Sequence, residues 1–257
     1  MKKGILVVSF GTSYEKTRKE CIESVEGKIQ SAFEEYDLRR AFTSNMIIKK
    51  LRERDNLNID TPSEALMKMV DAGMTEIHVQ PLHIIPGFEY EKVKRAIIMA
   101  QHKSDVKVTF GSPLLNEEHH YDEVVEALLE QLPQAVENEG ILLMGHGTEH
   151  HANACYSMLQ NKLRDRRTDI LIANVEGYPD LDHVMPAIEK KYKKMTLMPL
   201  MLVAGDHAIN DMAGEEDSYK SALEEKDIEV TCILQGLGQN QAIQEAFVKR
   251  VKEVVAK

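Results

Sequence analysis

Two histidines and one glutamate follow strands predicted in the second half of the chain, where together they could bind a transition metal. His146 ends one predicted strand and has a glycine on each side, which leaves its imidazole uncrowded. Glu176 ends the next predicted strand, and His207 follows the third through a short loop. Because ligands of open α/β sheets bind beyond the carboxyl ends of the strands, we expect these side chains to meet at one sheet edge.

These three donors limit which metals could bind, but they do not determine which reaction the site would catalyse. Two imidazoles and a carboxylate, with no thiolate, suit divalent cobalt, nickel, iron or zinc, and geometry rather than affinity would choose among them. The same set could serve a hydrolytic zinc site that activates water. Each residue also has an ordinary interpretation: His146 as a packed strand end, Glu176 as a solvated glutamate, and His207 as a residue of a first helical turn.

The neighbours of these residues suggest supporting roles. The second ring nitrogen of His207 could be oriented by an acceptor a few residues away, the candidates being Asp206, Asn210 and Asp211. His83 ends the third strand predicted in the first half, where it would line a cleft or pack as a strand histidine. The pairs at 119–120 and 150–151 are expected on helix surfaces, without a role in the site.

Short β-branched runs alternate with longer segments of helical period, which predicts an α/β fold with parallel sheets. The predicted strands span residues 4–10, 38–42, 76–82, 106–110, 140–145, 169–175, 195–201 and 228–234. The predicted helices lie near residues 14–33, 44–54, 62–72, 89–102, 119–132, 150–166, 180–191, 216–226 and 240–256.

The pattern repeats, which predicts two pseudo-symmetric halves. The run from Gly4 to Thr12 aligns with the run from Gly140 to Thr148, and Gln80-Pro81-Leu82 aligns with Met198-Pro199-Leu200. We therefore predict an N-terminal half at 1–137, with an inserted helical segment at about 43–60, and a C-terminal half at 138–257. Each half would be a four-stranded parallel sheet flanked by helices, with a ligand-binding cleft between the halves.

The two halves differ at the positions expected to face that cleft. Where the second half has His146, the first has Phe10, and where the second has His207, the first has Glu89. The metal-binding residue types are thus concentrated in the C-terminal half.

Composition narrows the class of protein. The chain has 257 residues, with 32 Lys and Arg against 42 Asp and Glu, for a net charge of −10. This acidic balance and the lack of a basic stretch argue against nucleic acid or a membrane surface as partner. The three scattered cysteines predict neither disulfides nor a thiolate zinc site, and no segment reads as a signal or membrane span. We expect a cytoplasmic protein that could form a homo-oligomer.

Several motifs resemble the anaerobic cobalt chelatases of the CbiK type, which are related in fold to ferrochelatase. The motifs are Leu6-Val7-Val8-Ser9-Phe10-Gly11-Thr12-Ser13, the runs 41–48 and 82–91, Met144-Gly145-His146-Gly147, and the distinctive run from Leu197 to Met212. The likeness covers essentially the whole chain.

The resemblance implies an enzyme of the lyase class that inserts cobalt(II) into sirohydrochlorin, a polycarboxylate tetrapyrrole, during anaerobic cobalamin biosynthesis. It implies His146, Glu176 and His207 as metal ligands, with His146, His207 and Glu89 as catalytic residues. Neutral imidazoles can hold a metal and then accept a pyrrole proton. No organic cofactor is expected. The alternatives are a zinc-dependent hydrolase with the same site and a non-catalytic carrier of metal or tetrapyrrole.

Overall fold

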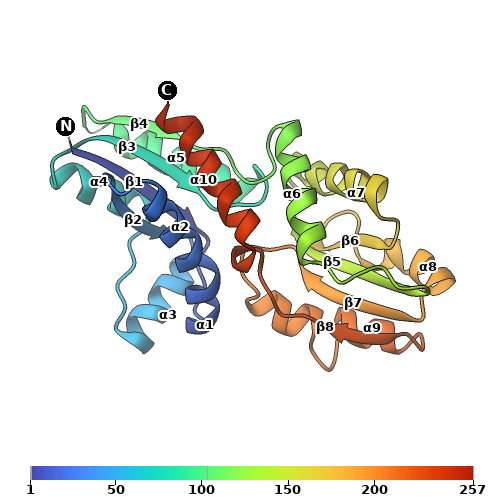
Figure 1. Cartoon of the computed structure of the whole chain (residues 1–257). Helices are drawn as coiled ribbons and strands as arrows, with labels where there is room; N and C mark the ends of the chain where they lie inside the picture. Colours follow the sequence, from blue (N-terminus) through green and yellow to red (C-terminus); the bar gives the residue numbers. More distant parts are fainter. Residues whose placement is uncertain (1, 103, 257) are drawn as a thin grey trace. The chain divides into compact units, whose positions relative to one another are not determined.

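The computed structural model describes residues 2–102 and 104–256, which form two four-stranded sheets flanked by helices (Figure 1). The first sheet has the spatial order β2-β1-β3-β4, from β1 (Lys2–Ser9), β2 (Asp37–Phe42), β3 (Met74–Pro81) and β4 (Lys107–Phe110). The second has the order β6-β5-β7-β8, from β5 (Glu139–Gly147), β6 (Ile170–Glu176), β7 (Lys194–Pro199) and β8 (Glu229–Cys232). All of these strand pairs are parallel, so the predicted fold class is confirmed.

The chain divides into two compact units that do not follow the predicted division at 137/138. Unit 1 contains Met1–Asn116 and Gln241–Lys257, and unit 2 contains Glu117–Asn240. The last helix of each predicted half belongs to the other unit. The helix α6 (Glu118–Gln131) packs on α7 (Ala154–Arg166) in unit 2, and α10 (Gln241–Val255) packs on α2 (Ser24–Ala32) in unit 1. Apolar faces decide this partition, because α10 buries Ile243, Phe247 and Val251 almost completely.

Helices cover both faces of each sheet, so the central strands are buried on both sides. In unit 1, α4 (Pro62–Asp71) and α5 (Phe88–Gln101) cover one face around an apolar cluster that includes Leu6 and Val79. In unit 2, α8 (Leu181–Lys191) and α9 (Tyr219–Glu224) cover one face and α7 packs on β6 from the other (Figure 1). This double cover explains the near-continuous apolar sequence of β1 and β5.

Local sequence fixes where the helices start. Thr61 and Glu64 form a reciprocal capping box at the first turn of α4, and Pro62 occupies its first position. At the start of α8, the Asp180 carboxylate accepts the backbone N–H of His183. The remaining short elements are α1 (Glu15–Thr17), η1 (Arg18–Glu23), η2 (His151–Asn153), η3 (Ala208–Met212) and η4 (Leu237–Gln239).

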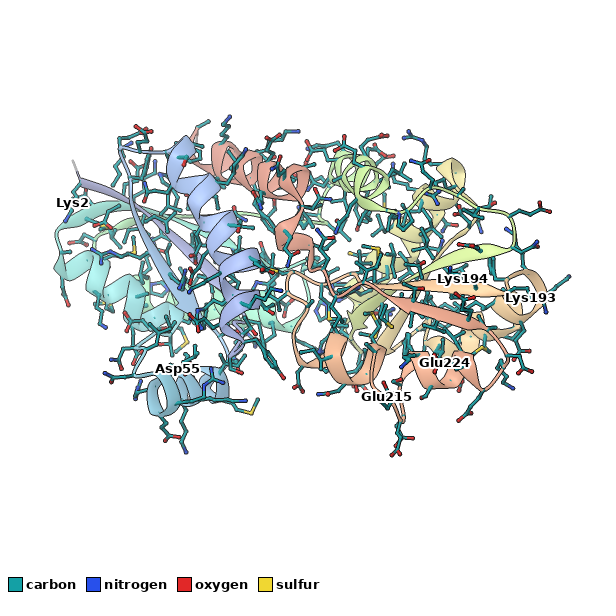
Figure 2. The ribbon with its side chains drawn as sticks, turned by 60° about the horizontal axis from the view of Figure 1, so that its bottom comes forward. Lys2, Asp55, Lys193, Lys194, Glu215 and Glu224 are labelled. Carbon is teal, nitrogen blue, oxygen red and sulfur yellow. The ribbon has the colours of Figure 1, made fainter. Side chains whose placement is uncertain are left out.

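The predicted inserted segment forms α3 (Asn45–Asp55), whose last residue is labelled in Figure 2. The segment leaves β2 and returns beside it, because Ala41 bridges Asp60 and the backbone N–H of Phe42 donates to the Asp60 carbonyl at 3.0 Å. Ser44 caps the helix and Asn56, in the left-handed region, ends it. In the described part of unit 2, β6 is followed directly by α8, so α3 is an addition to unit 1.

The strand order places a switch point at the middle of each sheet. In unit 2 the chain runs from β5 outward to β6 and then returns to β7 on the other side of β5. The connections at the carboxyl ends of β5 and β7 therefore diverge, and such a point is where open α/β sheets bind ligands. His146 lies on β5 and His207 follows β7.

Candidate metal centre

His146 is the exposed penultimate residue of β5. The strand is buried from Gly140 to Gly145, and His146 is the first side chain to reach solvent. Its Nδ1 lies 3.0 Å from the carbonyl oxygen of Gly147. Because a carbonyl oxygen only accepts, Nδ1 must carry the proton, and Nε2 is left with a lone pair that a metal can share.

His207 lies at the start of η3 and has the same tautomer for a similar reason. Its Nδ1 lies 2.6 Å from Oδ2 of Asp211, one of the three acceptors considered from the sequence. A carboxylate accepts the Nδ1 proton, so Nε2 again holds the lone pair.

The two imidazoles lie side by side, as the sequence predicted. Their ring centroids are 4.8 Å apart and the ring planes are nearly perpendicular, at 87°. Residues that are 61 positions apart in the chain are thus brought together by the pairing of β5 with β7. Two neighbouring imidazoles that each present an Nε2 lone pair are typical of a metal centre.

Glu176, the third predicted ligand, is the exposed last residue of β6 and pairs in register with Gly147. The backbones are in close contact here: a Cβ added to Gly147 would lie 1.6 Å from the Glu176 carbonyl oxygen. Gly147 also has φ of 75°, in the left-handed region that favours glycine. The main chain of Glu176 is therefore held against the strand that carries His146.

Another group of potential metal ligands has its ligand atoms closer together than His146, Glu176 and His207 do. Among the described residues, only Glu117, His119 and His120 have ligand atoms that all lie within 4.8 Å of one another. That group caps the start of α6. The backbone N–H of Glu117 donates to Nδ1 of His120 at 3.1 Å, so the Nδ1 lone pair of His120 is already used. The expectation of surface positions was wrong for His120, which is fully buried, and for His150, which is 8% exposed.

Glu89 belongs to unit 1, in the first turn of α5, after β3. The hydroxyl of Thr43 donates to its Oε2 at 2.8 Å, and Nζ of Lys92 lies 3.4 Å from its Oε1. These contacts hold the carboxylate at the carboxyl edge of the unit 1 sheet. Thr43 follows β2 directly. A search for polar residues at the ends of strands could therefore have found it, but it was not among the site residues predicted from the sequence.

The unit 1 counterpart of His146 is apolar and exposed. Phe10 follows β1 and is 49% exposed. Further exposed large apolar side chains lie where the helices after β1, β2 and β3 begin: Tyr14, Met46 and Phe88. The segments that follow β1, β2 and β3 in unit 1 therefore expose apolar side chains, whereas unit 2 exposes His146 and Glu176 at its strand ends.

Acidic residues lie near His207 in the sequence, and basic residues lie at the start of the preceding strand, β7. Asp206 and Asp211 flank His207, and Glu215 follows on the loop before α9, while Lys193 and Lys194 lie at the amino end of β7 (Figure 2).

His83 follows β3 in unit 1; the residue is partly buried and both of its ring nitrogens are buried. Among the described residues, neither ring nitrogen has a hydrogen-bond partner. Burial lowers the pKa of His83 to about 4, from 6.5.

Acidification should therefore destabilise the folded protein through His83. Between pH 6.5 and 4 the unfolded chain takes up a proton at this residue and the folded chain does not, so the free energy of unfolding falls as the pH is lowered. The shift corresponds to at most about 3 kcal/mol. Urea unfolding of the wild type and of His83→Phe at pH 7 and pH 5 tests this: the variant should lose less stability than the wild type. Equal losses would show that His83 is not buried in its neutral form.

No helix in the described part of the chain is long and apolar enough to cross a membrane.

Comparison with solved structures identifies the fold. SirB from Bacillus subtilis, solved with Fe3+, matches with a TM-score of 0.72 at 19% identity over 98% of this chain and 95% of SirB. SirB from Bacillus subtilis subspecies spizizenii, in complex with cobalt, matches with a TM-score of 0.70 at 18% identity, over 98% and 95%. CbiX, described as the terminal enzyme of siroheme biosynthesis in denitrifying bacteria, gives 0.61 at 15% identity, over 97% and 98%. The two parallel sheets therefore have the chelatase fold.

Sequence comparison is more specific. The model of the family described as cobalt chelatase (CbiK) matches residues 3–256. A sirohydrochlorin cobaltochelatase from Salmonella typhimurium is 42% identical over 257 residues, which cover 99% of this chain and 97% of the relative. The sirohydrochlorin cobaltochelatase CbiKC of Nitratidesulfovibrio vulgaris is 31% identical over 260 residues, covering 99% and 91%. The chain belongs to the CbiK family of cobalt chelatases, and the resemblance inferred from its motifs is confirmed.

Proposed function

We propose that this protein is an enzyme that inserts cobalt(II) into sirohydrochlorin. The relatives with 42% and 31% identity over nearly their full lengths carry that activity in their names. The observation on this chain that carries the proposal is the pair of imidazoles, His146 and His207, each with its Nδ1 proton engaged and its Nε2 lone pair available.

The reaction exchanges one divalent cation for two pyrrole protons. Cobalt(II) enters the ring, the two pyrrole nitrogens lose their protons, and no electrons are transferred. The protein must therefore hold the metal, release it to the ring nitrogens and accept protons. Imidazole Nε2 atoms can bind the metal first and take up a proton once the metal has left.

We assign the metal ligands to His146, His207 and Glu176. Glu176 supplies a negative charge that compensates the cation, and its side chain has only to turn about a backbone already fixed beside His146. Glu89, held by Thr43 and Lys92, is assigned as a further proton acceptor that carries protons away from the macrocycle.

The product would serve anaerobic cobalamin biosynthesis, and a cytoplasmic location fits such a biosynthetic enzyme. The metal is a substrate here, and the donor set would also accept nickel, iron or zinc.

Purified protein incubated without oxygen with sirohydrochlorin and each of cobalt(II), nickel(II), iron(II) and zinc(II) tests the proposal. The absorbance bands of sirohydrochlorin should convert to those of the cobalt complex over many turnovers, faster than without protein. A single stoichiometric change would indicate a carrier. Ester or phosphate hydrolysis without metallation would indicate a zinc hydrolase, and either result would reject the proposal.

A further inference from the structure

Within residues 2–102 and 104–256, the one hydrogen bond of the His207 ring goes to the side chain of Asp211. Asp211 lies four residues later, and its Oδ2 is 2.6 Å from Nδ1 of His207. The turn between them is a π-helix, η3, anchored by Ala208 and Met212, which are both fully buried. Because these anchors fix the backbone, the carboxylate lies beside the imidazole even though 43% of the Asp211 side chain is exposed.

His146 is oriented in a different way. Its Nδ1 proton is accepted by a backbone carbonyl, that of Gly147, whose position is fixed by the strand pairing of β5 with β6. The two metal-facing imidazoles therefore differ: one is aligned by the main chain of a sheet, and the other by a carboxylate on a short helix.

We infer that Asp211 is a positioning residue, which fixes the ring and the tautomer of His207 so that Nε2 faces the metal shared with His146. Its carboxylate is on the Nδ1 side of the ring, so it does not itself reach the metal that Nε2 would bind. Carboxylates that accept the second N–H of a ligating histidine orient the ligand and strengthen its hold on the metal. This inference rests on the proposed metal site.

Loss of Asp211 would leave His207 free to change both tautomer and rotamer. With no acceptor at Nδ1, the neutral ring can place its proton on Nε2, and that form cannot bind the metal from this side. The imidazole can also rotate about its side-chain bonds, because the side chain of His207 is 41% exposed. Both changes lower the fraction of protein that is ready to bind cobalt.

The test compares cobalt(II) binding by the wild type, Asp211→Ala, Asp211→Asn and Asn210→Ala. We expect Asp211→Ala to weaken cobalt affinity about 10- to 100-fold. Asp211→Asn keeps an oxygen that can accept the Nδ1 proton, so it should recover part of the affinity. Asn210→Ala, an exposed neighbour on the same helix, should bind like the wild type. In turnover, Asp211→Ala should raise KM for cobalt more than it lowers kcat.

The visible d–d absorption of bound cobalt distinguishes positioning from ligation. At saturating cobalt, the bands of Asp211→Ala should match those of the wild type, because the ligand set is unchanged. Lost or shifted bands would make Asp211 a direct ligand, and unchanged affinity would make it dispensable; both results overturn the inference. Equal losses of cobalt affinity in Asp211→Ala and Asn210→Ala would also overturn it, because they would indicate a general disturbance of η3. Failure of the wild type to metallate sirohydrochlorin would reject the proposed function instead, since cobalt binding is measured without the tetrapyrrole.

Discussion

Replacing His146 or His207 by alanine is expected to reduce the rate of cobalt insertion by at least about 100-fold. Each imidazole is assigned both to hold the metal and to accept a proton, and loss of a positioned proton acceptor alone typically costs about 100- to 10,000-fold. The rings are in contact, with centroids 4.8 Å apart, so removal of either should also weaken cobalt binding. Initial rates of sirohydrochlorin metallation, with cobalt affinity measured separately, check this result.

His183→Ala is the matched control. His183 is an exposed histidine of unit 2, with its Nδ1 2.6 Å from a carboxylate oxygen of Asp180, so it resembles His207 in its own contacts. Its ring lies against Tyr178 rather than against another imidazole. The control should insert cobalt at nearly the wild-type rate. Full activity in both His146→Ala and His207→Ala would show that the imidazole pair is not the reacting centre.

Replacing Gly147 by alanine should damage both stability and the metal site. The new methyl group would lie 1.6 Å from the Glu176 carbonyl oxygen, a backbone atom that can move only with β6. The left-handed conformation costs a non-glycine residue about 1–2 kcal/mol, and overpacking typically adds about 1–3 kcal/mol. We therefore expect the free energy of unfolding to fall by about 2–5 kcal/mol. The folded fraction should bind cobalt weakly, because β6 is pushed away from His146.

Gly73→Ala separates the clash from the backbone strain. Gly73 also has a left-handed φ, of 81°, but a Cβ added there meets no atom within 4 Å. It should lose only the strain of about 1–2 kcal/mol and keep the cobalt affinity of the wild type. Urea denaturation and cobalt titration of both variants make the comparison. If Gly147→Ala were no worse than Gly73→Ala in both measurements, the close packing of β5 against Glu176 would be refuted.

Most of the fold could be predicted from the sequence because local patterns determine it. The eight strands of the described residues were predicted to within a few residues, since β-branched runs buried on both faces have few alternatives in an α/β chain. The predicted segment at 43–60 forms α3 because Ser44 and Asn56 supply its two ends. The assignment of α6 and α10 to units could not be predicted in this way, because long-range packing of an amphipathic face leaves no local signal of which sheet it will cover.

The proximity of His146 and His207 could be predicted, whereas their assignment as a metal site stays a prediction. Glycines around His146 and the strand ends identified the two imidazoles, since the parallel topology brings neighbouring strand ends together. The partner of His207 could not be chosen from three candidates, because the choice depends on the π-helical turn of η3, which the sequence pattern did not reveal. The burial of His120 and of the His83 ring nitrogens could not be predicted either, because a histidine side chain can lie at the surface or in the interior.

X-ray absorption at the cobalt edge, on the wild type loaded with one equivalent of cobalt(II), tests the central claim most directly. The scattering should contain two imidazole rings bound through nitrogen, together with oxygen ligands, and each of His146→Ala and His207→Ala should remove one ring. A cobalt shell that contains only oxygen, or a two-ring signal that persists in both variants, would contradict the assignment of the metal to His146 and His207.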